Sequence, residues 1–166
     1  MRIGFGYDVH PLVEGRRLIL GGVEIPFEKG LEGHSDADVL LHAICDGILG
    51  ALGEGDIGRH FPNTDPRFKG ISSLRLLEAV ASKLAEKFFL VENLDSTVVA
   101  ENPKIGPYLP RMAEQIARTL RVGPDQVNIK ATTSEKLGFV GEGKGIAAYA
   151  VVLLKEDLQA KYPNYA

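Results

Sequence analysis

The chain has 166 residues, 45% of them hydrophobic and 25% charged, which is enough to build the core of one globular domain without disulfides. A net charge of −3 argues against binding nucleic acid by neutralising phosphates, and no apolar run approaches the roughly 20 residues of a membrane helix. The first residues lack the basic and apolar segments of a signal peptide, so we expect a mature, cytoplasmic protein that begins at Met1.

The first half of the chain contains two strand patterns and two helix patterns. Alternating residues predict a strand at residues 2–10, and a glycine pair between short apolar runs predicts a hairpin at residues 18–25. Apolar residues at helical spacing predict helices at residues 36–51, with Ser35 as the N-cap, and at residues 73–87.

A long connection and a second set of elements complete the chain. Residues 53–70 are expected to form one long ordered loop, and loops of that length are usually functional. Strands are then predicted at residues 94–100, 127–131 and 146–154, with a helix at residues 107–120.

These elements predict an α+β fold, in which a mixed β-sheet carries its helices on one face as a two-layer sandwich. Three helices cannot cover both faces of about five strands. The second face, rich in Val, Ala and Ile, is expected to be buried against copies of the same chain in a homo-oligomer. We expect a single domain at residues 1–156 and a short C-terminal extension at residues 157–166.

Histidine usage is the unusual feature of the composition. Cys45 is the only cysteine, so disulfides within the chain and cysteine-rich zinc sites are excluded. Three of the four histidines, His10, His34 and His42, lie close together in the sequence among several aspartates. Any metal would therefore be held by histidine and carboxylate.

A candidate metal site follows from two spacings. Asp8 and His10 are two residues apart on a strand, so both side chains leave the same face. Asp38, His42 and Asp46 lie four residues apart on a helix, and His42 could supply a third ligand. Two imidazoles and one carboxylate suit zinc with an open fourth position, which is the catalytic arrangement. The alternative is a surface strand pair and a core histidine with ordinary hydrogen bonds.

Four polar segments are candidates for ligand binding. Residues 33–36 could bind an anion or simply cap a helix, and residues 55–65 could bind hydroxyl groups or form ordinary turns. Residues 100–106 could contact a flat base or serve as a connector, and residues 131–136 could bind phosphate and Mg²⁺ or form a polar strand end. Neither a serine-hydrolase elbow nor a Rossmann or Walker phosphate loop is present.

Seven motifs in order carry a resemblance to one family. They are G-x-G-x-D-x-H, G-G-V-x-I-P, H-S-D-x-D-x-x-x-H, G-D-I-G, F-P-x-T-D-P, N-P-K and A-T-T-x-E-K-L-G-F. Each is weak alone, but together they resemble the 2-C-methyl-D-erythritol 2,4-cyclodiphosphate synthases of the non-mevalonate isoprenoid pathway, over about residues 1–155.

The resemblance implies an activity and an assembly. Members of the family cyclise 4-diphosphocytidyl-2-C-methyl-D-erythritol 2-phosphate and release CMP, which makes them phosphorus–oxygen lyases. The substrate's own phosphate is the nucleophile, which is consistent with the lack of a serine, cysteine or strong base. The family forms homotrimers with active sites between neighbouring subunits, so the small-molecule substrate is the expected partner besides further copies of the chain, with no nucleic acid or membrane.

The resemblance also implies roles for individual residues. Asp8, His10 and His42 would hold one Zn²⁺ per subunit, and Glu135 would contact a Mg²⁺ or Mn²⁺ that bridges the substrate diphosphate. His34 and Thr133 match the residues that stabilise the transition state. Asp38 and Asp46 are expected to orient His42 and fix its tautomer.

The remaining implied residues contact the substrate. The set comprises Asp8, Val9, His10, His34, Ser35, Asp56, Ile57, Gly58, Phe61, Pro62, Asn63, Thr64, Asp65, Ala100, Glu101, Asn102, Pro103, Lys104, Ile105, Gly106, Thr132, Thr133, Ser134, Glu135 and Phe139.

The chain departs from the family at two positions, and two other functions compete with cyclisation. Asn63 stands where an aspartate is common, and Glu142 stands where many members have an arginine that binds a prenyl diphosphate on the trimer axis. Glu142 would repel that ligand, although Lys144 restores part of the positive charge. The competing functions are a zinc-dependent phosphohydrolase of a nucleotide-linked substrate and a non-catalytic trimeric nucleotide-binding module.

Overall fold

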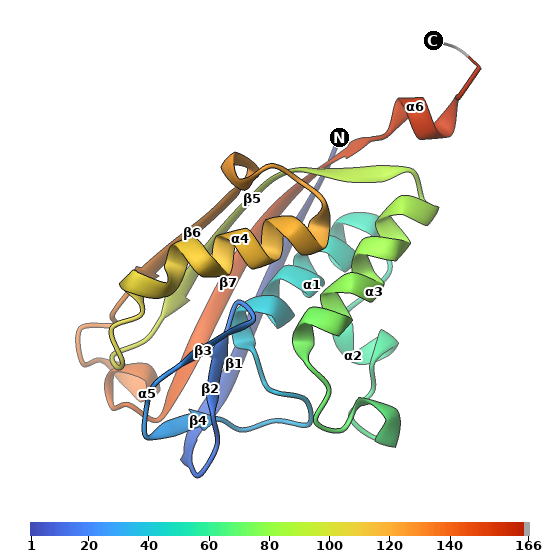
Figure 1. Ribbon diagram of the computed structural model, residues 1–166. Coiled ribbons are helices and arrows are strands. Elements are labelled where there is room, and N and C mark those ends of the chain that lie inside the picture. Colours follow the sequence, from blue (N-terminus) through green and yellow to red (C-terminus); the bar gives the residue numbers. More distant parts are fainter. Residues whose placement is uncertain (165–166) are drawn as a thin grey trace.

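The computed structural model describes residues 1–164 and contains a five-stranded sheet in the order β4-β1-β7-β5-β6 and a separate β2-β3 hairpin (Figure 1). The strands are β1 (Arg2–Glu14), β2 (Leu18–Leu20), β3 (Val23–Ile25), β4 (Lys29–Leu31), β5 (Phe89–Val99), β6 (Val127–Thr132) and β7 (Gly145–Glu156). Only β5 and β6 pair in parallel, so the sheet is mixed.

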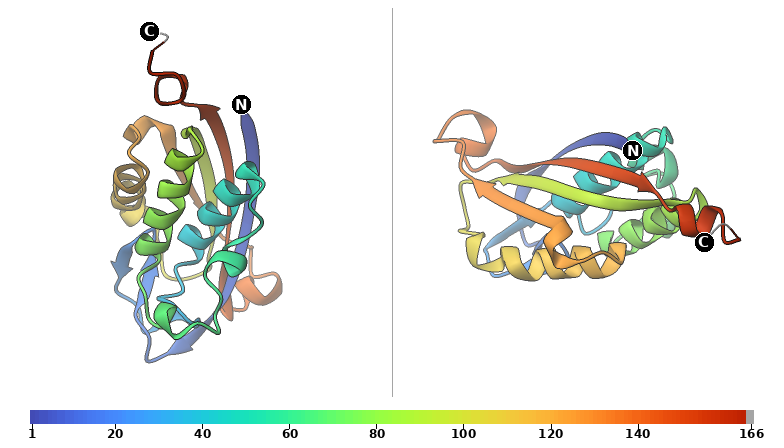
Figure 2. Two further views of the ribbon diagram at one scale, coloured as in Figure 1. Left: turned by 90° about the vertical axis from the view of Figure 1, so that its right-hand side faces the viewer. Right: turned by 90° about the horizontal axis from the view of Figure 1, so that it is seen from above.

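The three long helices α1, α3 and α4 cover one face of this sheet, as Figure 2 shows from two further directions. The helices are α1 (Val39–Leu52), α2 (Ile57–His60), α3 (Ser73–Glu86), α4 (Leu109–Leu120), α5 (Gly138–Gly141) and α6 (Leu158–Lys161). Helix α1 packs on β1 and β7, α4 packs on β6, and α3 lies beside α1 and α4. The predicted α+β fold, with its mixed sheet and helices on one face, is confirmed.

The opposite face of the sheet remains exposed in the single chain. Ile3, Phe5 and Tyr7 on β1 and Tyr149 and Val151 on β7 all present large apolar side chains there, with Ile3 72% and Phe5 62% exposed. These residues share one side of their strands, as the alternation predicts. Burial of this face against further copies of the chain stays a prediction.

Close approach of β1 to α1 depends on glycine. A Cβ at Gly6 would lie 1.8 Å from the carbonyl oxygen of Ala43, and one at Gly4 would lie 1.8 Å from that of Gly47. Backbone atoms cannot turn aside as a flexible side chain can, so no larger residue fits. Because Asp8 and His10 are on β1 and His42 is on α1, this contact sets the distance between them.

Two predicted features of the first half are wrong. Helix α1 starts at Val39 with Asp38 as its N-cap, not at residue 36 after Ser35, because Ala37 has a left-handed backbone (φ 58°) that interrupts a helix. Residues 53–70 are not one loop, since α2 and the 3₁₀ turn Pro66–Phe68 form within them.

The C-terminal end of the chain extends away from the sheet. Strand β7 ends at Glu156, and α6 projects beyond the body of the molecule (Figure 1). Residues 165–166 of the predicted extension lie outside the described residues. Among the helices of residues 1–164, none has the length and apolar character needed to cross a membrane.

Candidate metal centre and substrate pocket

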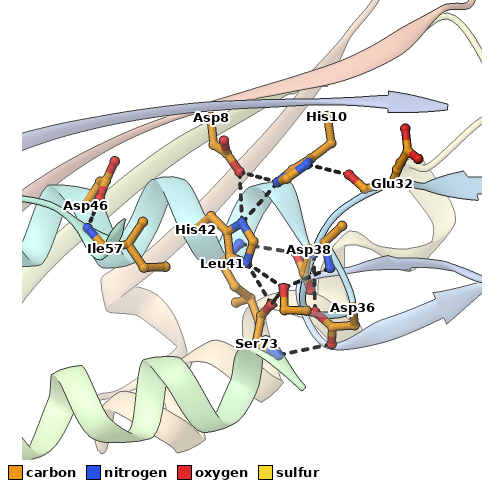
Figure 3. A network of polar contacts seen from close by, with 12 residues as sticks. Asp8, His10, Glu32, Asp36, Asp38, Leu41, His42, Asp46, Ile57 and Ser73 are labelled. Atoms are coloured by element: carbon orange, nitrogen blue, oxygen red, sulfur yellow. Dashed lines mark hydrogen bonds and ion pairs between the residues drawn. The ribbon is translucent and has the colours of Figure 1, made fainter. Parts of the chain in front are cut away.

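Three side chains from two elements converge at the centre of the candidate site (Figure 3). The Asp8 Oδ2 atom lies 2.9 Å from His10 Nε2 and 2.9 Å from His42 Nδ1, and the two nitrogens are 3.2 Å apart. Strand β1 carries Asp8 and His10 on the face toward α1, which carries His42. In the part of the chain that the structure describes, these three form the one group of ligand side chains close enough to hold a metal.

Each imidazole has a hydrogen-bond partner at the nitrogen that faces away from the three-residue cluster, and its other nitrogen faces the cluster. His10 Nδ1 lies 2.7 Å from the carbonyl oxygen of Glu32, which can only accept, so Nδ1 carries the proton. His42 Nε2 lies 2.9 Å from Ser73 Oγ. The inner atoms, His10 Nε2, His42 Nδ1 and Asp8 Oδ2, face one another, so either protons or a metal cation must lie between them.

The spacing of the three atoms also fits a metal. Around a tetrahedral ion with bonds of about 2.0 Å, neighbouring ligand atoms lie roughly 3.3 Å apart. The observed separations of 2.9 to 3.2 Å are slightly shorter than this value. A modest outward movement would complete a three-ligand site with one open position.

Without a metal, protons between the imidazoles and Asp8 take its place, and the pKa values of Asp8 and His10 reflect this. Burial raises the pKa of Asp8, but hydrogen bonds with His10 and His42 outweigh burial and lower the pKa to about 2. Burial lowers the pKa of His10, but its hydrogen bond with Asp8 outweighs burial, and the net pKa is raised. The Asp8 carboxylate therefore stays ionised at neutral pH, which favours binding a cation.

Asp38 and Asp46 do not orient His42, which corrects the prediction. The buried Asp38 carboxylate accepts hydrogen bonds from the backbone N–H groups of Gly21, Gly22 and Leu41, at 3.0, 2.7 and 3.2 Å. It therefore caps α1 and ties the helix to the β2-β3 hairpin. Within residues 1–164, neither Asp38 nor Asp46 hydrogen-bonds the His42 ring, and Asp46 accepts from the backbone of Ile57 at 2.7 Å.

The pocket beside the three ligands contains several of the predicted substrate residues. It has a volume of about 250 Å³, and its lining residues are His10, Gly33, His34, Ser35, His42, Ile57, Phe61, Asn63, Phe68 and Leu76.

Two segments hold this pocket in shape. Arg16 donates to the carbonyl oxygens of Gly33 and Ser35, at 3.1 and 2.9 Å, and the His34 Nε2 atom lies 3.1 Å from the carbonyl oxygen of Asp65. The carboxylate of Asp65 accepts from Arg67 at 2.6 Å, so it is already engaged within its own turn. The residues around His34 and the turn at Asp65 are thus linked to each other across the pocket.

A second group of predicted residues lies apart from the metal ligands. Strand pairing places Val9 of β1 opposite Ala147 of β7, Ala147 opposite Val99 of β5, and Val99 opposite Thr132 of β6. Three strand spacings separate β1 from β6, which is about 14 Å. The loops at residues 100–106 and 132–136 therefore do not meet the metal ligands of their own chain.

Glu101 joins these two loops through its carboxylate. The Oε1 atom accepts from the backbone N–H groups of Ser134 at 2.9 Å and Lys136 at 3.1 Å. Glu135 and Lys136 both have left-handed backbones, with φ of 54° and 61°. Glu101 thus stabilises a tight turn, in which Thr133 Oγ1 donates to Glu135 Oε1 at 2.6 Å.

Sequence reasoning missed the residues that hold the two histidines. The carbonyl oxygen of Glu32 contacts His10, and the Ser73 hydroxyl contacts His42. Asp36 hydrogen-bonds the Ser73 hydroxyl. No spacing signals them, because they come from three separate segments. At the departure from the family pattern, Glu142 forms an ion pair with Lys144 at 2.5 Å.

The fold and the three ligands define a class of protein: an α+β protein with a mixed sheet and a candidate metal site made of two histidines and one aspartate. The chain belongs to the YgbB family, which matches residues 1–155.

Individual relatives make the similarity more specific. The chain is 65% identical over 154 residues to a 2-C-methyl-D-erythritol 2,4-cyclodiphosphate synthase of Pelobacter propionicus, covering 93% of this chain and 98% of the relative. It is 63% identical over 155 residues to the enzyme of the same name from Geotalea uraniireducens, covering 93% and 99%. A solved complex of Plasmodium falciparum IspF with CDP superposes with a TM-score of 0.82 at 37% identity, covering 93% of this chain and 96% of that one.

Proposed function

We propose that this chain is a 2-C-methyl-D-erythritol 2,4-cyclodiphosphate synthase. It converts 4-diphosphocytidyl-2-C-methyl-D-erythritol 2-phosphate to the 2,4-cyclodiphosphate and releases CMP, in isoprenoid precursor biosynthesis. The convergence of three ligand atoms from Asp8, His10 and His42 beside a pocket is the observation that carries this proposal. The similarity to synthases along nearly the whole chain supports it.

The reaction joins two phosphates within one substrate molecule. A bond forms between an oxygen of the 2-phosphate and the β-phosphorus, and the bond from the β-phosphorus to the oxygen of CMP breaks. The nucleophile is already an anion, so the protein must bring negative groups together and stabilise charge on the leaving group. No serine or cysteine nucleophile is required.

The metals and the residues that would hold them divide this work. Asp8, His10 and His42 would hold Zn²⁺, which polarises a phosphate oxygen when bound. Glu135 would contact Mg²⁺ or Mn²⁺, which neutralises charge on the diphosphate. His34 and Thr133 would donate hydrogen bonds to the phosphate oxygens as charge develops.

The remaining polar loops would bind the two ends of the substrate. The loop at residues 56–65 lines the pocket beside the metal ligands and would bind the sugar hydroxyls, with Asn63 contributing an amide. The backbone at residues 100–106 would bind the cytidine, which the CDP complex of the Plasmodium relative supports.

We also propose a homotrimer with active sites shared between subunits. The exposed apolar face of the sheet needs a partner, because Ile3, Phe5 and Tyr7 form a continuous apolar row on it. The metal ligands and the loop at residues 132–136 lie about 14 Å apart across the sheet in one chain. A site that uses both groups is completed when a neighbouring copy supplies the second one.

The test measures product formation by metal-free and reconstituted protein. We expect zinc together with Mg²⁺ to restore CMP release, with the cyclic diphosphate visible by ³¹P NMR. His42→Ala should abolish this activity, while Ser82→Ala, which lies outside the site and loses a hydrogen bond to the Glu78 carbonyl, should retain it. Light scattering should give three times the 18.0 kDa chain mass. No CMP release by zinc-loaded protein would refute the proposed activity.

A further inference from the structure

Ser73 and Asp36 form a hydrogen-bonded pair behind the His42 ring, on the side away from Asp8 and His10 (Figure 3). Ser73 is the first residue of α3 and is fully buried, and its Oγ lies 2.9 Å from His42 Nε2. Asp36 binds Ser73 twice: Oδ1 accepts a short hydrogen bond from the Ser73 hydroxyl, and Oδ2 accepts from the Ser73 backbone N–H at 3.0 Å.

The direction of these bonds determines the tautomer of His42. An ionised carboxylate only accepts, so the Ser73 hydroxyl gives its one proton to Asp36. The Ser73 oxygen can then only accept from the ring, and the proton of His42 must be on Nε2. Nδ1 then faces Asp8 Oδ2, 2.9 Å away, where a metal would bind.

Ser35 does not impose this order, although its Oγ lies 3.2 Å from His42 Nε2. Ser35 accepts from the backbone N–H of Ala37 at 3.1 Å, and no carboxylate among the described residues takes its proton. Its hydroxyl could donate to the ring, donate to Ser73 Oγ 3.4 Å away, or accept from the ring. Only the Asp36–Ser73 pair fixes the direction.

Backbone hydrogen bonds fix the position of Asp36 relative to Ser73. Asp36 donates from its own N–H to the carbonyl of Ile71 at 3.0 Å, and the N–H of Gly70 bonds to the carbonyl of His34 at 2.7 Å. These bonds join the segment before α1 to the segment before α3. Asp36 and Ser73 are thus held in one position relative to each other.

We propose that Asp36 and Ser73 are the positioning residues of His42, which select its Nδ1 atom as the metal ligand. This inference rests on the proposed metal site and assigns a role that Asp38 and Asp46 were expected to have. A carboxylate that hydrogen-bonds a ligand histidine directly orients the ring and strengthens metal binding. Here we expect Asp36 to have the same effect through the Ser73 hydroxyl.

The experiment measures zinc affinity of metal-free protein by competition with a chelator, independently of activity. We expect Ser73→Ala to weaken zinc binding by about 10- to 100-fold, and Asp36→Asn to weaken it by less, because the amide keeps one acceptor. Ser82→Ala is the matched control, since this exposed serine on α3 bonds only to the carbonyl of Glu78. It should bind zinc as the wild type does.

Nitrogen NMR of the histidine rings separates positioning from a general loss of stability. In the wild-type protein the His42 spectrum should show a protonated Nε2, and Ser73→Ala should show a mixture of tautomers. Wild-type affinity and an unchanged His42 spectrum in both Ser73→Ala and Asp36→Asn would overturn the inference. If the wild-type protein itself fails to bind zinc, the metal site is refuted instead.

Discussion

Replacing Gly6 by alanine is expected to damage the fold and the metal centre together. The added Cβ would lie 1.8 Å from the carbonyl oxygen of Ala43 and 2.8 Å from the backbone nitrogen of Gly47. Helix α1 would have to retreat from β1 by more than about 1 Å to restore ordinary contact. We expect a loss of about 3 kcal/mol or more in the free energy of unfolding, at the upper end for overpacked cores. Because His42 precedes Ala43, the retreat would also separate its Nδ1 from Asp8.

Gly50→Ala provides a matched control on the same helix. The Cβ would have 4.0 Å to its nearest neighbour, and alanine is the better helix former, so this variant should gain up to about 1 kcal/mol. Urea unfolding and zinc competition would be measured on both variants. Equal stability of Gly6→Ala and Gly50→Ala, or full zinc affinity in Gly6→Ala, would refute the reasoning.

Three further outcomes are expected. Burial raises the pKa of the Cys45 thiol above its ordinary value, so iodoacetamide at pH 8 should label Cys45 only after unfolding; stoichiometric labelling of native protein would contradict this. Glu101→Ala should lower kcat/KM by about tenfold, because two backbone N–H groups lose their acceptor. Glu101→Gln keeps the acceptor and should retain most of the activity. Equal losses in the two variants would count against the role of Glu101 as a bridge between the two loops. The pKa of Asp8 is lowered to about 2, so the contribution of Asp8 to stability is present above about pH 4 and is lost as the pH falls toward 2. Over this pH range the urea midpoint of metal-free Asp8→Asn should therefore fall less steeply than that of the metal-free wild type. Equal slopes for the two proteins would exclude this contribution.

The layers of the fold could be predicted because each long element has a clear hydrophobic period. Strand β1 alternates over most of its length, and α4 places Met112, Ile116 and Leu120 on one buried face. Strand β4 was missed because it has three residues and begins with a lysine-glycine pair, with no alternation. Its pairing depends on the end of β1, which is a tertiary contact.

The metal ligands could be predicted, but the residues that support them could not. Spacing offers Asp8, His10 and His42 as a candidate metal site beside an ordinary alternative, and the family resemblance selects the metal site. Asp38 was assigned to His42 because it lies four residues earlier, yet it caps the helix, since Ala37 has a left-handed backbone just before it. Spacing within one helix predicts which residues share a face of that helix. It does not predict that Ser73, on another helix, contacts the His42 ring.

In the proposed reaction an internal phosphate, and not water, attacks the β-phosphorus. The most direct measurement is the reaction of zinc- and Mg²⁺-loaded protein in ¹⁸O-labelled water, with the products analysed by mass spectrometry. We predict CMP and a cyclic diphosphate that both lack the label. An ¹⁸O atom in an open-chain phosphate product would show attack by water and contradict the assignment as a cyclising lyase.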